Sequence, residues 1–503
     1  MRASRVDVAQ QGLRAENERL WAENARLRAQ LEEARRAGRR QAAPFSKGEP
    51  RKDPARPGRK RGEQYGTRAR RRIPDRVDEE IQVPLPAACT CGCAELDAEG
   101  VVDQYQEEIV EVPTRVRRYI ISVGRCRRCG RRVQGRHPEQ TSDAVGAAGS
   151  QIGPRAVAIA AQLNKELGIA MSKVAGILEL LGLSVTPGGL YQAIGRLAVA
   201  AEPTGQALVL AVRASAAVAA DETGWRVAGR RQWLWVFVGD DGVTVYLIAA
   251  GRGYEQAQSI LGESFAGVLE RDGWAPYRRF ASAEHQTCLA HLLRRTGELI
   301  ADSVAGQAKI PHAARRLLLD ALAVRDAHRD LLTGGDVIEG SAVEITDDQP
   351  LLSDGGGDGD DGEMIAARPE RQAHLDTEIA RLQREIDTLI SRNPSHAPNQ
   401  RLLKHLANER DHLLTFLSTR GVAATNWRAE QAIRPAVVNR KNWGGNRTPH
   451  GANVQQTLMS VIRTSRQQDV CPITLLTDLQ RQTAPAPSSM LRLPTTTADP
   501  RGP

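Results

Sequence analysis

The stretch SAAVAADETGWRVAGRRQWLWVFVGDDGVTVYLIAA, residues 215–250, is the part of this 503-residue chain that most clearly indicates a fold. It contains three apolar runs rich in β-branched and aromatic residues, at 215–221, 232–239 and 243–250. Runs of this kind predict β-strands, and the turn GDDG between the second and third run predicts a hairpin. We therefore expect three consecutive antiparallel strands.

The sequence after these strands changes to an alternation of helix and strand. A helix is expected at 254–261, a fourth strand in AGVLERDG at 266–273, and a fifth short strand in TCLAH at 287–291 that leads into a helix. Antiparallel strands followed by alternating helices and strands are typical of a mixed α/β sheet. Six of the seven Trp lie between Trp225 and Trp443, which favours a main folded core in this region.

Three acidic residues could meet at one edge of this sheet. Asp221 ends the first expected strand and Asp272 ends the fourth, while Glu430 lies on an expected helix in NWRAEQAIRPAVVNRKNWGGNRT, residues 426–448. Three carboxylates at one point repel one another, so such a cluster favours bound hard cations of the Mg²⁺ or Mn²⁺ type. Spacing alone does not select these three, because an isolated acid more often caps a helix or pairs with Arg. The competing acids nearby are Glu222, Asp240, Asp241 and Glu270.

The N-terminal part predicts a coiled coil over residues 8–40. Leu13, Leu20 and Leu27 recur every seven residues, and an adjoining seam carries Asn17, Asn24 and Leu31. Leu at d with Asn at a positions favours a two-stranded coil, and hence a homodimer, with a higher oligomer as the other possible assembly. The alternative is a single amphipathic helix that packs on its own protein.

A basic linker is expected next, over residues 41–77. Its run of Arg, Lys, Pro and Gly cannot build a core, and it contributes to a net charge of +9 for the whole chain. Such a run gains affinity for phosphate by releasing counterions. A tether that only improves solubility is the alternative.

The cysteine pattern predicts a zinc ribbon over residues 78–140. Two β-like runs separate CTCGC from a Cys-x-x-Cys knuckle, and four thiolates would hold a structural Zn²⁺ in a reducing compartment. Two of the first three cysteines would join the second pair. The candidate ligands are Cys89, Cys91, Cys93, Cys126 and Cys129.

Further segments divide the rest of the chain. Residues 150–200 resemble a helix-turn-helix whose second helix begins at Thr186 and Pro187, although an ordinary helical hairpin fits as well. We expect a first part of the α/β core at 212–302, a helical insertion at 303–420, a last part of the core at 421–466 and a tail at 467–503. The Gly-rich acidic stretch 334–367 and the residues after about 483 are expected to be disordered. No apolar run is long enough to cross a bilayer, and we expect a cytosolic protein.

The order of motifs resembles the transposases of the insertion-sequence 66 family. The resemblance runs through DETGWRV, WLWVFV, RGYEQAQSILG, GVLERDGWAPY, TCLAHLLRR and the 426–448 segment, and it covers nearly the whole chain. It implies a DDE transposase with a ribonuclease-H-like catalytic core that cleaves transposon ends and transfers the 3′-OH into target DNA. Two features depart from the pattern: the acidic segment 334–367 and the third cysteine of CTCGC.

The resemblance also assigns roles to individual residues. It implies that Asp221, Asp272 and Glu430 are catalytic and hold Mg²⁺ or Mn²⁺, and that Cys288 and His291 form a structural Cys-x-x-His element. DNA would be the main partner, with accessory transposition proteins as possible further partners. A non-catalytic DNA-binding regulator and a nuclease on the same fold are the alternatives. Four basic residues are our candidates for phosphate contacts: Arg434, Arg440, Lys441 and Arg447.

Overall fold

The computed structural model describes residues 16, 18–24, 26–27, 73–88, 90–97, 100–106, 114–145, 151–304, 306–332, 368–482 and 484–493. The chain divides into two compact units, one of residues 46–117 and one of residues 1–45 with 118–503. The sheet, its covering helices and the candidate site all belong to the second unit. No helix in the described ranges combines the length and the apolar character that a bilayer span requires.

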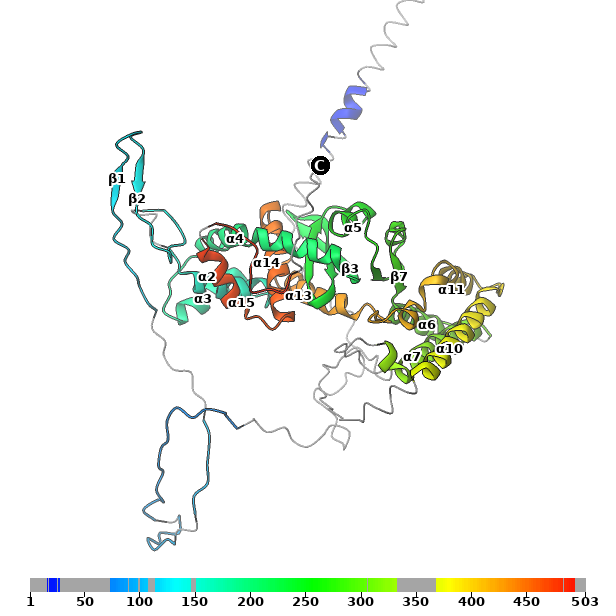
Figure 1. The fold of residues 1–503 in the computed structure, drawn as a ribbon, viewed down its shortest axis with the longest axis horizontal. Helices are drawn as coiled ribbons and strands as arrows, with labels where there is room; N and C mark the ends of the chain where they lie inside the picture. Colours follow the sequence, from blue (N-terminus) through cyan, green and yellow to red (C-terminus); the bar gives the residue numbers. More distant parts are fainter. Residues whose placement is uncertain are drawn as a thin grey trace, which may run out of the picture. The chain divides into compact units, whose positions relative to one another are not determined.

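The order of elements matches the sequence pattern, in which three strand-like runs are followed by alternating helices and strands (Figure 1). The strands are β1 (Val123–Arg125), β2 (Arg132–Gln134), β3 (Ala217–Val227), β4 (Arg230–Val238), β5 (Thr244–Ala249), β6 (Val268–Arg271) and β7 (Glu284–Thr287). The helices before and between the strands are α2 (Pro154–Lys165), α3 (Met171–Leu180), α4 (Pro187–Ala214) and α5 (Tyr254–Leu261). Those after β7 are α6 (Leu289–Ala301), α7 (Lys309–Ala327), α8 (Arg329–Leu332), α10 (Arg368–Ile390), α11 (Ala397–Asn408), α12 (Thr415–Ser418), α13 (Trp427–Trp443), α14 (Pro449–Gln467) and α15 (Pro472–Arg481). Short 3₁₀ turns lie at Asp240–Gly242, Ala275–Arg279 and Arg410–His412.

Five strands form one mixed sheet in the order β5-β4-β3-β6-β7. The strands β3, β4 and β5 are antiparallel, as the turn signals predicted, and β6 and β7 run parallel to β3. The fifth strand lies at 284–287, earlier than the expected 287–291, because the helix that follows it already begins at Leu289.

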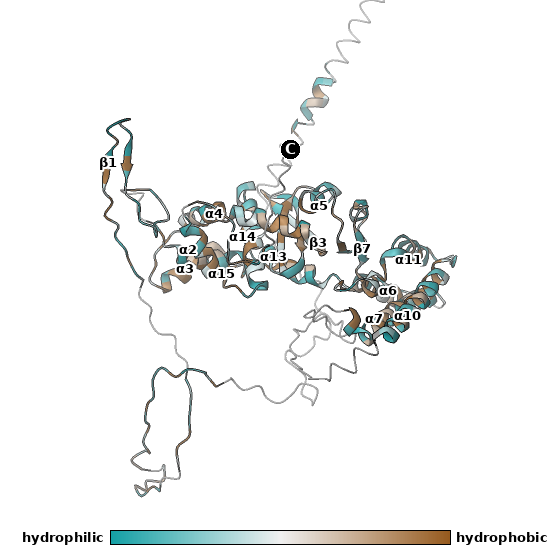
Figure 2. Cartoon of the chain, in the orientation of Figure 1, coloured by the Kyte–Doolittle hydropathy of each residue, from teal (hydrophilic) through white to brown (hydrophobic). Residues whose placement is uncertain are grey.

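Helices cover both faces of this sheet. Alternate residues of β3 and β4, including Val218, Ala220, Trp235 and Phe237, join a core built with α4 and α5. The intervening residues join a second core built with α13 and α14. Strand residues alternate between faces, so the apolar runs are buried on both sides. The strands around β3 are accordingly mostly hydrophobic (Figure 2).

The segment expected to resemble a helix-turn-helix is helical throughout. The side chain of Thr186 accepts a hydrogen bond from Gly189 N at 3.1 Å, and Pro187 occupies the first turn, which confirms the predicted start of α4. The helix continues past residue 200 to Ala214 and ends shortly before β3. Contact of α4 with DNA stays a prediction.

A separate hydrophobic cluster lies in the helices that follow β7. Side chains of α6, α7, α10, α11 and α12 pack together, with Leu382, Leu402 and Phe416 among the fully buried ones. These helices lie together beyond β7, on the side of the sheet away from α2 and α3 (Figure 1). The predicted acidic segment 334–367 interrupts this region and lies outside the described residues.

The structure describes only part of the N-terminal region for which the sequence made predictions. Residues 16, 18–24 and 26–27 are helical, with Leu20 and Leu27 exposed, while most of the predicted coiled coil and the linker lie outside the described residues. Of the two strands expected between the cysteine groups, the second is present as β1, at the end of the run 115–125. In the first run, residues 103–106 are not in a strand, and 107–113 lie outside the described residues. β1 pairs with β2 in a hairpin whose turn contains Cys126 and Cys129.

The zinc site itself stays a prediction. Cys91 and Cys93 belong to the unit of residues 46–117, whereas Cys126 and Cys129 belong to the other unit, and Cys89 lies outside the described residues.

The C-terminal segment is more ordered than expected. The helix α15 packs on α2, and residues 484–493 follow it along the helical core. Ser488 N donates to Thr204 Oγ1 at 3.0 Å, Arg492 N donates to Gln468 Oε1 at 2.7 Å, and Leu491 is buried. The prediction of disorder after about 483 is therefore wrong for 484–493, because these backbone and apolar contacts offset the polar composition.

Candidate active site

Strand register brings Asp221 and Asp272 side by side. In the parallel pair of β3 and β6, Ala219 lies opposite Glu270, and the same register two residues further sets Asp221 beside Asp272. Both side chains point to the sheet face that α13 covers. Asp221 is an even number of residues from Ala219 and Trp225, whose side chains belong to the core on that face.

Asp221 is not at the end of its strand, which corrects the sequence prediction. β3 continues to Val227 and turns through Ala228 and Gly229, both with positive φ, into β4. This is the two-residue hairpin geometry that suits twisted antiparallel strands. The strand that ends at the site is β6, so the carboxylates lie where the parallel pairing of β3 stops.

Backbone donors hold one oxygen of each aspartate. Glu222 N donates to Asp221 Oδ1 at 2.8 Å, and Trp274 N donates to Asp272 Oδ1 at 2.9 Å. Each bond fixes the orientation of the carboxyl group relative to its strand.

Glu430 reaches the same place from the first turn of α13. Asn426, directly before this helix, donates from its side chain to Ala220 O at 2.7 Å and from its backbone to Cys288 Sγ at 3.2 Å. The start of α13 is thereby attached to both β3 and α6. Asn426 was missed from the sequence, where only its position before an acid-bearing helix could have suggested this role.

The three acids are close enough to affect one another. Desolvation and the negative charges of Glu222, Asp272 and Glu430 together raise the pKa of Asp221 to about 8, although a backbone hydrogen bond from Glu222 lowers it. Asp272 and Glu430 are therefore near enough to Asp221 for their charges to act on its carboxyl.

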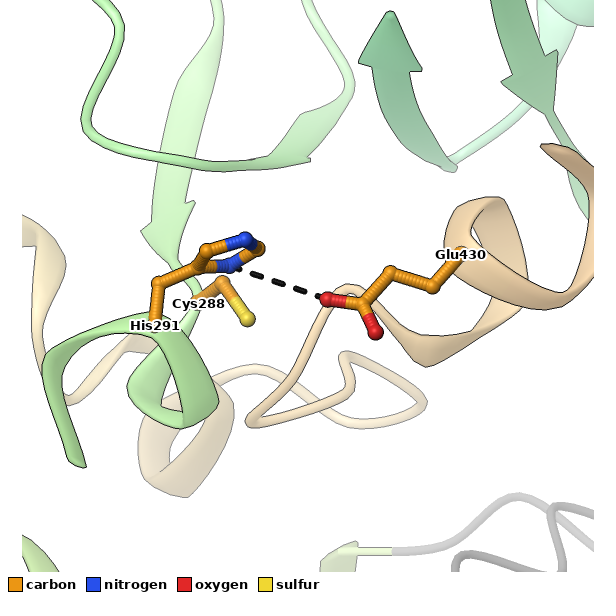
Figure 3. A group of neighbouring side chains, drawn as sticks. All are labelled: Cys288, His291 and Glu430. Atoms are coloured by element: carbon orange, nitrogen blue, oxygen red, sulfur yellow. Dashed lines mark ion pairs between the residues drawn. The ribbon is translucent and has the colours of Figure 1, made fainter. Parts of the chain in front are cut away.

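Cys288 and His291 lie beside Glu430, which the sequence did not predict. Cys288 directly precedes α6 and His291 is in its first turn, with the Nδ1 atom of His291 3.7 Å from Glu430 Oε1 (Figure 3). One ligand atom from each of the three residues lies within 4.8 Å of the others. Burial raises the pKa of the Cys288 thiol to about 12.

The competing acids have other partners. Glu222 points to the opposite face, where Arg252 pairs with it and Tyr277 OH donates at 2.8 Å. Glu270 pairs with Arg428 at 3.1 Å, and Asp240 accepts from Ala216 N at 2.6 Å. These bonds give the three acids structural roles.

The predicted phosphate-binding residues differ in exposure. The side chains of Arg434, Lys441 and Arg447 are exposed, whereas Arg440 is half-buried and donates to Thr223 Oγ1 at 3.1 Å. Burial lowers the pKa of Arg440. This guanidinium is used to dock α13 on β3.

The segment after α13 docks on the end of β3. Trp443 contacts Trp225 edge to face with ring centroids 5.9 Å apart, so it packs in the core. Trp225 Nε1 donates to Asn446 Oδ1 at 2.8 Å, and Gly445, with φ of +107°, lies against the backbone of Arg226, where a Cβ would collide. The pair of glycines in WGGN is explained by this close approach.

Comparison with known proteins gives one family. A family model described as "Transposase IS66 family" matches residues 149–454, more than half of the chain, and this range contains Asp221, Asp272 and Glu430. No curated protein matches the chain.

Proposed function

The chain belongs to the IS66 family of transposases, and from that premise we propose that it cleaves DNA at transposon ends and transfers the freed 3′-OH into target DNA. Family membership implies DNA transposition and catalytic transposase activity. The five-stranded mixed sheet is consistent with a ribonuclease-H-like DDE domain. The observation that carries the proposal is the parallel register of β3 and β6, which sets Asp221 beside Asp272, with Glu430 near enough to help raise the pKa of Asp221.

The donor set fits divalent cations with a preference for oxygen. Two Asp and one Glu supply only carboxylate oxygens, and Glu430 Oε1 is buried without a hydrogen-bond partner among the described residues. Bound Mg²⁺ or Mn²⁺ would activate the attacking water or 3′-OH and stabilise the leaving oxygen. In this proposal Asp221, Asp272 and Glu430 hold these ions through the oxygens that the backbone does not engage.

The remaining residues of the site hold these three in position and guide DNA. Asn426 sets the first turn of α13, and Arg440 keeps the helix against β3. The exposed Arg434, Lys441 and Arg447 would contact phosphates, so that affinity falls as salt rises. The N-terminal coiled coil would supply a dimer and the cysteines of 78–140 a zinc ribbon, both as parts of the same proposal.

The test is a nicking assay on DNA that carries the transposon ends. Asp272→Asn should bind the ends as the parent does and lose nicking in Mg²⁺ by more than about a hundredfold, because a ligand of the ions is lost. Asp241→Asn is the matched control. It makes the same chemical change at an exposed turn with φ of +50°, a conformation that Asn tolerates, and it should cleave normally.

Three results would contradict the proposal in different ways. Full nicking by Asp272→Asn would remove this residue from the site. Metal-independent binding without any nicking by the parent protein would favour a regulator. Cleavage without dependence on end sequence and without strand transfer would favour a nuclease.

A further inference from the structure

We propose that Cys288, His291 and Glu430 form a three-ligand site for a thiophilic divalent cation of the Zn²⁺ class, and that filling this site withdraws Glu430 from the catalytic carboxylates. The second half of this proposal rests on the proposed function, whereas the first half depends only on the three side chains (Figure 3).

The separations suit one small ion. Two ligand atoms about 2.0–2.1 Å from a tetrahedral Zn²⁺ lie roughly 3.4 Å apart, and a thiolate at about 2.3 Å lies slightly further from each. His291 Nδ1 and Glu430 Oε1 are 3.7 Å apart, and the Cys288 sulfur lies within 4.8 Å of both ligand atoms. Small rotations of the half-exposed His291 and Glu430 side chains bring all three into range.

Buried polar atoms without hydrogen-bond partners support the presence of an ion between these residues. His291 Nδ1 and Glu430 Oε1 are both buried atoms without a hydrogen-bond partner in the described part of the chain. Their separation is too long for a hydrogen bond. Buried polar atoms are costly when unsatisfied, and one cation placed between them satisfies both.

The donor types select a different metal from the carboxylate site. Thiolate and imidazole favour Zn²⁺ and Co²⁺, whereas Mg²⁺ prefers oxygen ligands alone. The His291 and Glu430 side chains remain 36% and 33% exposed, which leaves an open side for a water or a phosphate oxygen as fourth ligand. Three protein ligands with one open position are typical of accessible zinc sites.

The surroundings hold the ligands in place. Asn426 N donates to Cys288 Sγ at 3.2 Å, and Leu289 N donates to Ala424 O at 3.0 Å. The first turn of α6 and the start of α13 are thus locked together, and the ligand atoms of both helices face one another.

Sharing of Glu430 gives the site a consequence for activity. A carboxylate directed toward Cys288 and His291 by a bound ion is no longer available to Asp221 and Asp272. Zn²⁺ bound by Cys288 and His291 should therefore inhibit Mg²⁺-dependent cleavage by removing Glu430 from the carboxylate set.

Binding is tested with Co²⁺ as a spectroscopic substitute for Zn²⁺ on the full chain. The thiolate-to-cobalt charge-transfer band of the parent should exceed that of Cys288→Ser by the intensity of one thiolate, since the N-terminal cysteines are present in both. His291→Ala should weaken the binding that gives this difference by at least tenfold. Cys471→Ser, which removes an exposed thiol before α15, is the matched control and should keep the full band.

The outcome of this titration decides the first half of the proposal. Identical spectra for the parent and Cys288→Ser, with both proteins folded by circular dichroism, would overturn the site. A loss of the band in Cys471→Ser would assign the thiolate elsewhere and also overturn it.

Inhibition is tested by adding Zn²⁺ to the Mg²⁺-dependent nicking assay. The Zn²⁺ concentration for half inhibition should rise at least tenfold in His291→Ala, measured relative to each protein's own Zn²⁺-free rate. An unchanged value would overturn this inhibition while leaving the cobalt result intact. No nicking by the parent in Mg²⁺ alone would instead contradict the proposed function.

Discussion

Asp221 is a single residue whose ionised carboxylate the fold makes unfavourable. Its carboxyl is partly buried, and desolvation together with the charges of Glu222, Asp272 and Glu430 raises its pKa to about 8. The folded protein thus keeps a proton that the unfolded chain loses near pH 4. Stability falls as pH rises wherever the folded state binds more protons than the unfolded state.

We predict that the metal-free protein loses stability as pH rises from about 4 to about 8. The loss attributable to Asp221 is at most about 1.4 kcal/mol per pH unit in this window, and it stops above the folded pKa. Asp221→Asn cannot ionise, so its free energy of unfolding should fall less steeply. Urea unfolding in a chelator at several pH values measures both curves.

Mg²⁺ and a matched variant complete this test. Mg²⁺ should stabilise the parent at pH 8 and leave Asp221→Asn nearly unchanged, because only the parent carries the full carboxylate set. Asp241→Asn should follow the parent. Parallel curves for the parent and Asp221→Asn would show that the carboxyl of Asp221 does not have a raised pKa.

The sequence located these acids but not their surroundings. Asp221, Asp272 and Glu430 could be named because each stands in a motif that resembles the transposase family, whereas their spacing alone did not select them. The roles of Asn426 and His291 could not be predicted, since both depend on how α6 and α13 approach each other. That approach is a tertiary contact without a local signal.

The contact between α14 and β5 is the clearest relation between two elements. β5 is an edge strand, and three of its backbone N–H groups are bonded by side chains of α14. Thr244 N donates to Thr464 at 3.0 Å, Tyr246 N to Ser460 at 2.9 Å, and Ile248 N to Gln456 at 2.9 Å.

The spacing of these hydrogen bonds follows from the rise per residue of an α-helix and of a β-strand. Four helical residues rise about 6.0 Å and two strand residues about 6.6 Å, so a helix that runs along the strand can meet every second N–H. The edge is thereby closed to pairing with another strand. The polar positions 456, 460 and 464 do carry a four-residue period, but only the structure identifies their partner.

We predict that Ser460→Ala lowers the free energy of unfolding by about 1–3 kcal/mol, because the buried N–H of Tyr246 loses its acceptor. Denaturant unfolding measures the change. Ser465→Ala on the same helix is the control. Its buried hydroxyl donates only to Ile462 O within the helix, and the loss should stay below about 0.5 kcal/mol. Equal losses in the two variants would contradict the role of α14 as cover for the edge.

The sequence predicted the strands of the sheet better than the segments that pack through long-range contacts. The antiparallel meander at 217–249 followed from turn signals and β-branched runs, which act locally. The segment 484–493 was predicted to be disordered, because its composition is polar. A few long-range contacts, such as that of Ser488 N with Thr204, outweigh this local composition.

The described part of the larger unit is built on separate hydrophobic cores that polar contacts join. The sheet and its covering helices form the cores of the catalytic part, and the helices after β7 form another cluster. Gly273, next to Asp272, lies against His405 of α11, where a Cβ would collide with the imidazole ring. The geometry of the Asp-Gly turn thus depends on a helix that is more than a hundred residues away in the sequence.

Glu409 is at the centre of the polar contacts between the sheet region and the helices that follow β7. Its fully buried carboxylate pairs with Arg271 and Arg278 at 2.5 Å and accepts from Thr287 Oγ1 at 2.7 Å. Arg271 also donates to Asp272 O at 3.1 Å. Although burial alone would raise the pKa of Glu409, the charge of Arg271 and these hydrogen bonds lower it.

We predict that Glu409→Gln destabilises the protein by roughly 3–5 kcal/mol, because it leaves the buried guanidinium of Arg271 without a counter-charge. Nicking should fall as well, since Arg271 no longer holds the backbone of Asp272. Asp411→Asn is the control, because its pair with Arg410 is exposed and contributes under about 1 kcal/mol. Denaturant unfolding and the nicking assay measure both effects. If Glu409→Gln matched Asp411→Asn in stability, the helical region would be held by its apolar contacts alone, and Asp272 would not depend on it.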